Sequence, residues 1–517
     1  MTTNIWIRPG ADVPWGSASY GTGDGSSYAN AFAGLQDTGI DWGIRDLQVW
    51  ICGVHAPLET SFNNVSHYFL SPVTGGSAYQ PTIIRGDDPN EAGRIWGGQF
   101  YPLTEWTAHP TYANVYQLDL PRADAPTLYQ ITNGWLHDVG ADHLGHDRLV
   151  KQANAEDVRD NAGSYYATGT TGGSTVYVRL ADDADPSAAH RVLFPARGYR
   201  LKFDGIAHTV FRQLDIFGTR CTLVKNGIGF IRCTIKYAQK NETYPGIMIG
   251  NNSKKVDDVA VYRCNLGSCS YGAVYTTWVR PVNGVVQPQP HNWFVALNLI
   301  EEVGAAPWNE QHHPDDHGIG IQNCDTFFAY GNIIENTGPG IVAYAGGRNN
   351  PAEYMRNVHI RRNMLRGMRN EAEIAYPRGI EHDGQDGVLD CTGNVIAYNV
   401  VSDMPIGPND PVSYPGAAYK FADVNPQNVP LFEWNVARNV PDSIYTNGAG
   451  QYMTVTNFTS LAPTAKHVRL RSTTANATFT NNTYAGGPGG DEFKNGVTDY
   501  TWAEWQSAGY DAGSSHS

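Results

Sequence analysis

The chain has 517 residues, a formal net charge of −14 and only 17% charged residues. The negative charge argues against a nucleic-acid-binding protein, which needs surplus Lys and Arg to displace counterions from phosphates, and it disfavours docking onto anionic membranes. Its 56 Gly, 29 Tyr and 13 Trp predict short strands joined by many turns rather than helices, and no apolar run is long enough to span a membrane.

The N-terminal region predicts a cap. Residues 1–6 have neither the basic nor the apolar segment of a secretory leader, so we expect a secreted or virion-associated protein whose leader is absent or whose export follows another route. Residues 26–35 predict a short helix, with Ser26 as its N-cap and Phe32 and Leu35 facing inward. Such a helix would close the open end of a stack of coils, and residues 1–100 would hold this cap and the first coils.

Residues 101–195 interrupt the pattern that surrounds them. The turn-rich segment 112–120 and the alternating segment 174–180 predict a small inserted or accessory antiparallel β subdomain.

A repeat dominates residues 196–485. An apolar strand ends in Asn plus an aliphatic residue at intervals of 31 to 36 residues, at Asn265, Asn298, Asn332, Asn363, Asn399 and Asn435. Thr234 and Asp215 take the same place in two shorter, earlier turns. A single block cannot bury its apolar face, so blocks stack as coils whose strands pair in parallel and whose Asn side chains form a ladder. Leucine-rich repeats need a shorter, Leu-dense period. We therefore predict an all-β, right-handed parallel β-helix, closed by a second cap at 486–517.

The seven cysteines include no CxxC pair and mostly lie in apolar segments. We expect them to be buried and unpaired, including Cys264 and Cys269.

Three segments, together with the coils, carry a resemblance to a known group of proteins. They are residues 23–32, the strand 176–180 with the Asp185-Pro186-Ser187 that follows it, and residues 505–511. The chain resembles secreted or phage-borne right-handed β-helix proteins of the pectin-lyase-like superfamily. The resemblance implies a polysaccharide hydrolase, lyase or epimerase, or a phage tailspike, and the fold alone does not choose among them.

Aligning the coils on their glycines points to residues 378–383 as the candidate site. Alternation along a strand directs Glu381 and Asp383 outward and His382 inward, and it places Tyr344 and Lys420 beside Asp383 on the neighbouring coils. Glycoside hydrolysis needs two carboxyl groups, one of them a general acid, and the proximity of like charges would raise one pKa. The alternative is that both are surface carboxylates that pair with Arg378 and Lys420.

A second segment, 310–318, precedes a strand of the same face. Asp316 is a candidate third acid, and the candidate substrate-binding residues are His317, Tyr344, Arg378, Lys420, Gln322 and Trp308. The adjacent His312 and His313 match no zinc-binding spacing, so no metal site is predicted.

The leading hypothesis is a glycoside hydrolase without a cofactor that acts on a polysaccharide in an open cleft. The alternative is a polysaccharide lyase that cleaves a uronate polymer. In that enzyme Lys420, His317 or Arg378 would be the base and Tyr344 the acid, and the carboxylates would hold Ca²⁺. A third possibility is a glycan-binding or tailspike scaffold without turnover. Neither nucleic acid nor membrane is an expected partner.

Overall fold

The computed structural model describes most of the chain, namely residues 2–10, 20–35, 37, 39–55, 76–96, 98–99, 106–120, 129–132, 135–136, 149–168, 174–186, 192–195, 200–202, 206–218, 220–236, 238, 246–249, 255–267, 269, 272–276, 289–303, 317–344, 354–368, 377–384, 391–405, 416–422, 429–447, 452–471 and 476–517.

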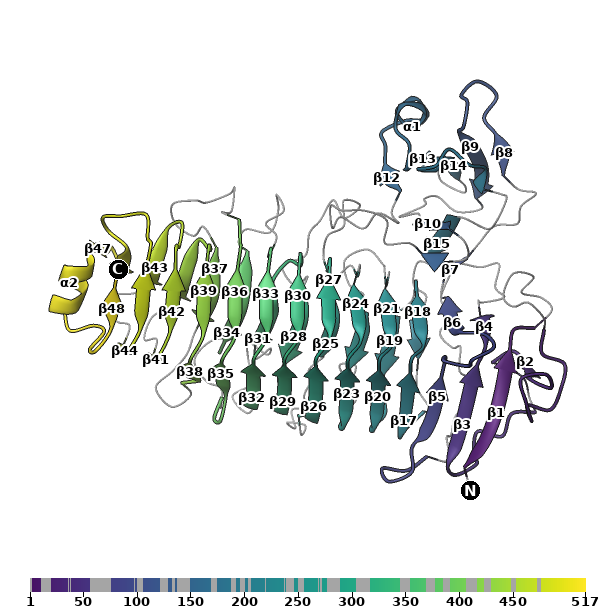
Figure 1. The fold of residues 1–517 in the computed structure, drawn as a ribbon, viewed down its shortest axis with the longest axis horizontal. Coiled ribbons are helices and arrows are strands. Elements are labelled where there is room, and N and C mark those ends of the chain that lie inside the picture. The colour runs from purple at the N-terminus through teal and green to yellow at the C-terminus, as the bar shows by residue number, and fades with distance from the viewer. Residues whose placement is uncertain are drawn as a thin grey trace, which may run out of the picture.

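Three long sheets form the solenoid, and between β16 and β45 successive coils add one strand to each (Figure 1). The 14-stranded sheet contains, in spatial order, β2 (Phe32–Ala33), β1 (Thr3–Arg8), β3 (Leu47–Ile51), β5 (Thr82–Arg85), β17 (Thr209–Arg212), β20 (Ile228–Ile231), β23 (Val259–Tyr262), β26 (His291–Ala296), β29 (Asp325–Tyr330), β32 (Arg356–Arg361), β35 (Val395–Ala397), β38 (Leu431–Glu433), β41 (Tyr452–Thr456) and β44 (Asn476–Thr480).

The 13-stranded sheet contains β4 (Gly53–His55), β6 (Gly93–Trp96), β18 (Asp215–Phe217), β21 (Thr234–Lys236), β24 (Asn265–Gly267), β27 (Leu299–Glu301), β30 (Ile333–Glu335), β33 (Met364–Arg366), β36 (Val400–Ser402), β39 (Val436–Arg438), β42 (Thr459–Leu461), β45 (Thr483–Ala485) and β48 (Ser515–His516). The 12-stranded sheet contains β16 (Arg200–Lys202), β19 (Arg220–Leu223), β22 (Ile247–Ile249), β25 (Gly272–Thr276), β28 (His317–Gln322), β31 (Ile341–Tyr344), β34 (Arg378–Asp383), β37 (Ala417–Ala422), β40 (Asp442–Asn447), β43 (Lys466–Leu470), β46 (Phe493–Asn495) and β47 (Thr498–Tyr500).

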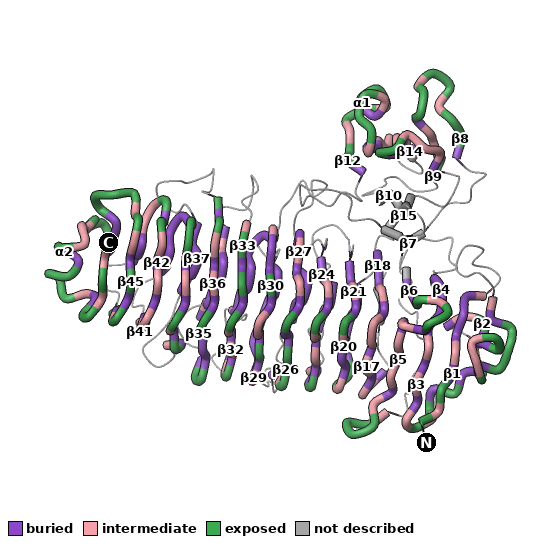
Figure 2. The backbone as a smooth tube through the Cα atoms, in the orientation of Figure 1, coloured by how far each residue is buried: buried purple, intermediate pink, exposed green. Residues whose placement is uncertain are grey.

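The pairing within these sheets is parallel, apart from the terminal β46–β47 pair. Inward-facing residues stack in register from coil to coil: Ile319, Ile341, Ile380 and Tyr419 are paired neighbours, and each is at most 1% exposed. Buried and less buried residues alternate along the coils (Figure 2). Stacking of coils therefore buries the apolar face that no single coil can bury, and the prediction of a parallel β-helix is confirmed.

An asparagine ladder joins the coils at the corner between the 14- and 13-stranded sheets. It runs through Asn298, Asn332, Asn363, Asn399 and Asn435, and Nδ2 of each donates to Oδ1 of the next at 2.9–3.0 Å. Each Oδ1 also accepts from the backbone N–H of the preceding ladder residue. All five side chains are buried, so the ladder satisfies polar groups that water cannot reach.

The prediction was wrong by one residue for the earlier coils. Cys264 occupies the ladder position, because its N–H donates to Asn298 Oδ1 at 2.8 Å, whereas Asn265 is the first residue of β24 and pairs with Leu299. Thr234 and Asp215 are in register with Asn265 and so lie outside the ladder as well. A thiol in place of the amide ends the ladder there.

The two ends of the solenoid differ. The N-terminal helix predicted at residues 26–35 is absent: this segment forms turns and the short strand β2, which pairs in parallel with β1. Gly25 and Gly34 have φ of +77° and +91°, which a right-handed helix excludes, although Phe32 and Leu35 are buried as predicted. The C-terminal cap does contain a helix, α2 (Trp502–Ser507), which Thr501 caps and whose Trp505 is buried.

Between β6 and β16 the residues that the structure describes form two small sheets outside the solenoid (Figure 1). One contains β11 (Trp135–Leu136), β10 (Tyr129–Thr132), β15 (Val192–Pro195) and β7 (Gly98–Gln99); the other contains β12 (Val150–Lys151), β13 (Ser164–Ala167), β14 (Ser174–Arg179), β9 (Tyr116–Leu120) and β8 (Thr107–Ala108). Their pairing is antiparallel as predicted, except for β12–β13. A short helix, α1 (Ala155–Asp160), was not predicted.

All seven cysteines are buried and free, as expected. Among the described residues, no helix is long and apolar enough to cross a membrane.

Candidate functional site

The outer face of the 12-stranded sheet carries the candidate site. On β34 the side chain of His382 points into the solenoid, where its Nε2 lies 3.0 Å from Asn394 Nδ2, and burial lowers the pKa of this imidazole to about 4. Because neighbouring side chains on a strand point to opposite faces, Glu381 and Asp383 point outward. The predicted orientation of this strand is therefore correct.

Glu381 is a buried carboxylate held by two cations. Lys420 Nζ lies 2.5 Å from its Oε1, and Arg378 Nη1 contacts its Oε2. The Glu381 side chain is 2% exposed, and those of Arg378 and Lys420 are 14% and 13% exposed. Burial by itself would raise the pKa of Glu381, but Arg378 and Lys420 outweigh it and hold the pKa at about 2. Glu381 is therefore ionised at neutral pH and does not have the raised pKa of a general acid.

The register corrects the predicted position of Lys420. It lies beside Glu381, not beside Asp383, whose neighbours are Tyr344 and Ala422. The prediction aligned Gly416 with Gly379, but Arg378 pairs with Ala417, so Gly416 lies before the paired segment. Two residues of offset keep Lys420 on the outer face and change its partner.

Three rings lie together on the coils before Glu381. The rings of Tyr275 and Tyr344 lie 6.2 and 6.4 Å from that of buried His317, and the two phenol oxygens are hydrogen-bonded to each other. They meet over Gly320, where a Cβ would lie 2.5 Å from the Tyr275 ring. This glycine leaves room for the ring of Tyr275 to reach across the intervening coil to Tyr344.

A second buried ion pair lies on the coils after Glu381. Arg469 donates to both oxygens of Asp442, at 2.6 and 3.2 Å, and the Asp442 side chain is fully buried. Burial raises the pKa of Asp442 to about 6, although Arg469 and Lys466 oppose this shift. Tyr445 on β40 lies between the two ion pairs, because it is in register with Lys420 on one side and with Arg469 on the other. The outer face thus contains carboxyl groups whose environments shift their pKa in opposite directions.

Tyr275, Asp442, Tyr445 and Arg469 were not predicted from the sequence. Aligning the coils on glycine matched Gly272 to Gly318, although Gly272 pairs with His317, and this shift of one residue placed Tyr275 on the inner face. The strands β40 and β43 begin without a glycine. The alternation of polar and apolar residues in those strands was the available signal.

Of the predicted residues, the structure brings together His317, Gln322, Tyr344, Arg378, Glu381, Asp383 and Lys420 on the adjacent strands β28, β31, β34 and β37. Gln322 is in register with Tyr344, which is in register with Asp383. Asp316 and Trp308 lie outside the described residues, as do His312 and His313.

A calcium ion on Glu381, as suggested for a lyase, conflicts with this geometry. Both carboxylate oxygens already contact a cation, and a third positive charge would be repelled. In the described part of the site, Glu381 is therefore a poor ligand for a metal ion.

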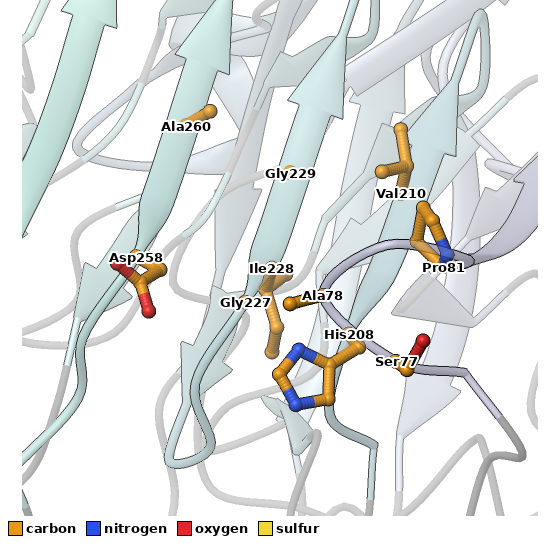
Figure 3. Close-up of a pocket in the computed structure, with 10 residues that line it drawn as sticks. All are labelled: Ser77, Ala78, Pro81, His208, Val210, Gly227, Ile228, Gly229, Asp258 and Ala260. Carbon is orange, nitrogen blue, oxygen red and sulfur yellow. The ribbon is translucent and has the colours of Figure 1, made fainter.

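A hollow of about 410 Å³ lies on a different sheet, over β17, β20 and β23 (Figure 3). Small residues create it: Gly229 and Ala260 face outward beside Val210, and His208 lies against Gly227 at its edge. Among the described residues that line it, Asp258 carries the one carboxyl group. The described lining of the hollow lacks the paired charges found around Glu381, so its volume alone does not make it the reaction site.

Comparison with known proteins identifies the architecture. A solved structure of XylC in complex with xylose aligns with a TM-score of 0.54 and 10% identity, over 96% of this chain and 86% of the other. The chain is a parallel β-helix protein.

Two further parallel β-helix structures align with lower TM-scores. A double-mutant tailspike protein of the E. coli bacteriophage HK620 gives 0.30 at 11% identity, over 57% of this chain and 59% of the other. A family 28 exopolygalacturonase of Yersinia enterocolitica gives 0.29 at 12% identity, over 87% and 67%. No family model and no curated protein matches the sequence. At 10% identity, the alignment with XylC establishes the fold alone.

Proposed function

We propose that this parallel β-helix protein cleaves glycosidic bonds of a polysaccharide on the outer face of its 12-stranded sheet. The observation that carries the proposal is the carboxyl pair on β34, in which Glu381 is kept ionised by Arg378 and Lys420 while Asp383 lies two residues along the same face.

The two carboxyl groups fit different roles. Residues two apart on a strand have Cα atoms about 6.5–7 Å apart, which is compatible with the roughly 5–9.5 Å between the carboxyl groups of glycoside hydrolases. A carboxylate with a pKa of about 2 stays ionised, which suits a nucleophile or an electrostatic stabiliser of the transition state rather than a general base. Each carboxylate oxygen has two lone pairs, so Glu381 keeps acceptor capacity beside its two cations. Asp383, which is half-buried, takes the role of proton donor.

The ring cluster supports a sugar-binding face next to this pair. Tyr344 is the direct neighbour of Asp383 on β31, and its hydroxyl is held by Tyr275. Aromatic rings with a fixed polar group suit a sugar, which has apolar faces and hydroxyl edges. The XylC structure with the same fold contains xylose, so xylan and its oligosaccharides are the first substrates to test.

The test is a panel of xylans and uronate-containing polysaccharides, scored for reducing ends and for ultraviolet absorbance of unsaturated ends. Wild type should release reducing ends and Asp383→Asn should not. The control variant Glu433→Gln, on β38 of another sheet, should release them as wild type does. Unsaturated products would instead identify a lyase. Glycan binding without any product would identify a scaffold, and full activity in Asp383→Asn would refute the site.

A further inference from the structure

A second cluster of ligand-type side chains lies near the C-terminal cap, away from β34. His467 on β43, Glu492 just before β46, and His516 on β48 each offer one nitrogen or oxygen, and these three atoms all lie within 4.8 Å of one another. His516 Nε2 is 2.6 Å and His467 Nε2 is 3.9 Å from Glu492 Oε2. Neither the predicted nor the proposed function uses these residues.

His467 is oriented as a ligand. Its side chain is fully buried, and its Nδ1 lies 2.6 Å from Ser460 Oγ, which in turn lies 2.7 Å from Ser443 Oγ. A hydrogen bond from Nδ1–H to a fixed oxygen leaves a lone pair on Nε2, which is how metal-binding histidines are commonly held. Within the described residues, this buried Nε2 has no hydrogen-bond partner. Such an atom calls for an explanation, and an ion beside it is one.

The other two ligands are also fixed. Glu492 Oε1 accepts a hydrogen bond from the N–H of Gly489 at 3.1 Å, which leaves Oε2 directed toward both histidines. The ring of His516 stacks on Trp502, with centroids 5.5 Å apart. Its side chain is 23% exposed, so the cluster has a route to solvent.

Gly487 maintains space beside the cluster. A Cβ at this position would lie 2.2 Å from Glu492 Oε1 and 3.1 Å from His467 Nε2. Its φ is not in the left-handed region, so backbone conformation does not require glycine there. Close packing against the candidate ligands does.

We propose that His467, Glu492 and His516 form a binding site for Zn²⁺ that joins β43, β48 and the segment before β46. Two imidazoles and a carboxylate are typical zinc ligands, and three protein ligands leave a fourth position for water. Bonds of about 2.0–2.2 Å in tetrahedral geometry require ligand atoms roughly 3.3–3.5 Å apart. The present separations of 2.6 and 3.9 Å bracket that value, so small side-chain movements suffice.

The test is titration of Zn²⁺ into chelator-treated full-length protein, followed by calorimetry and by the shift of the thermal unfolding midpoint. Wild type should bind one zinc ion per chain and unfold at a higher temperature with zinc. His516→Gln, at the exposed edge, should weaken binding by more than the roughly 10–100-fold that loss of a supporting hydrogen bond costs. Ser460→Ala should fall within that range.

The matched control is His291→Ala. His291 Nδ1 lies 2.9 Å from Asp257 Oδ1, and among the described residues this histidine and carboxylate belong to no group of three metal ligands. Its substitution should leave zinc binding unchanged. Zinc binding that His516→Gln weakens no more than Ser460→Ala does, or no binding in wild type, would overturn the proposal and would leave only a His516–Glu492 ion pair. Circular dichroism of zinc-free His516→Gln establishes that the variant is folded.

Discussion

Replacing Glu381 by Gln tests whether this carboxylate is the ionised centre of the outer face. Its pKa is about 2 instead of 4.5, and a factor of ten in proton affinity is worth about 1.4 kcal/mol, so ionisation contributes about 3 kcal/mol at pH 7. Removing one member of a buried ion pair typically costs about 3–5 kcal/mol, because the other charge is left uncompensated. We therefore expect Glu381→Gln to lower the free energy of unfolding by about 3–5 kcal/mol.

The pH dependence makes the prediction specific. The folded-state pKa of Glu381 lies below the unfolded one, so its stabilisation is fully present above about pH 4.5 and is lost as pH falls toward 2. The difference in free energy of unfolding between wild type and Glu381→Gln should therefore decrease as pH falls through this range. Urea unfolding at pH 7, 5 and 3 measures it, with hydrogen exchange in β34 and β37 as a local readout, because a solenoid need not unfold in one step.

Glu433→Gln is the control and should change stability by no more than about 0.5 kcal/mol. Lys420→Met combined with Glu381→Gln should cost less than the sum of the two single changes, since each single change leaves a buried partner charge. The assignment of Glu381 as a buried, doubly paired carboxylate would be refuted if wild type and Glu381→Gln differed in free energy of unfolding by less than about 1 kcal/mol, or if their difference were constant across the pH range.

Three further outcomes follow from the fold. Asn363→Ala removes four hydrogen bonds of the ladder and leaves buried groups such as the N–H of Asn332 without a partner, so it should lower the free energy of unfolding by about 3–6 kcal/mol in thermal or urea unfolding. The control, exposed Asn476→Ala, should lower it by less than about 0.5 kcal/mol, and equal losses in the two variants would contradict the ladder's role. His382 is protonated near pH 6.5 in the unfolded chain and near pH 4 in the folded chain, so the stability of wild type should fall by about 3 kcal/mol as pH drops between these values. His382→Gln should lose correspondingly less stability over the same range, and identical stability–pH profiles would count against a neutral buried imidazole. Gly229→Leu fills the hollow of Figure 3 without a close backbone contact, and polysaccharide cleavage should be unchanged. A loss of cleavage in this variant would indicate that the reaction site lies on that sheet instead.

The solenoid and the outward direction of the β34 carboxylates could both be predicted from the amino-acid sequence. A coil period of 31 to 36 residues is visible in the sequence because every coil must bury an apolar face in the same way. Because Ile380 and His382 point inward, Glu381 between them must point to the opposite face. The ladder was also predictable, because a buried amide at one corner satisfies its neighbours only if the next coil repeats it.

Which side chains meet across coils could not be predicted, because it depends on the register between neighbouring strands. An offset of two residues preserves the alternation of faces but changes the partner, so the sequence pattern placed Lys420 on the correct face and beside the wrong carboxylate. Likewise, His467, Glu492 and His516 come from separate segments with no common spacing, and they meet only because the C-terminal segment returns to add β48 to the last coils. Periodicity specifies the face of a strand, whereas register and chain return specify the neighbours, and pKa values depend on those neighbours.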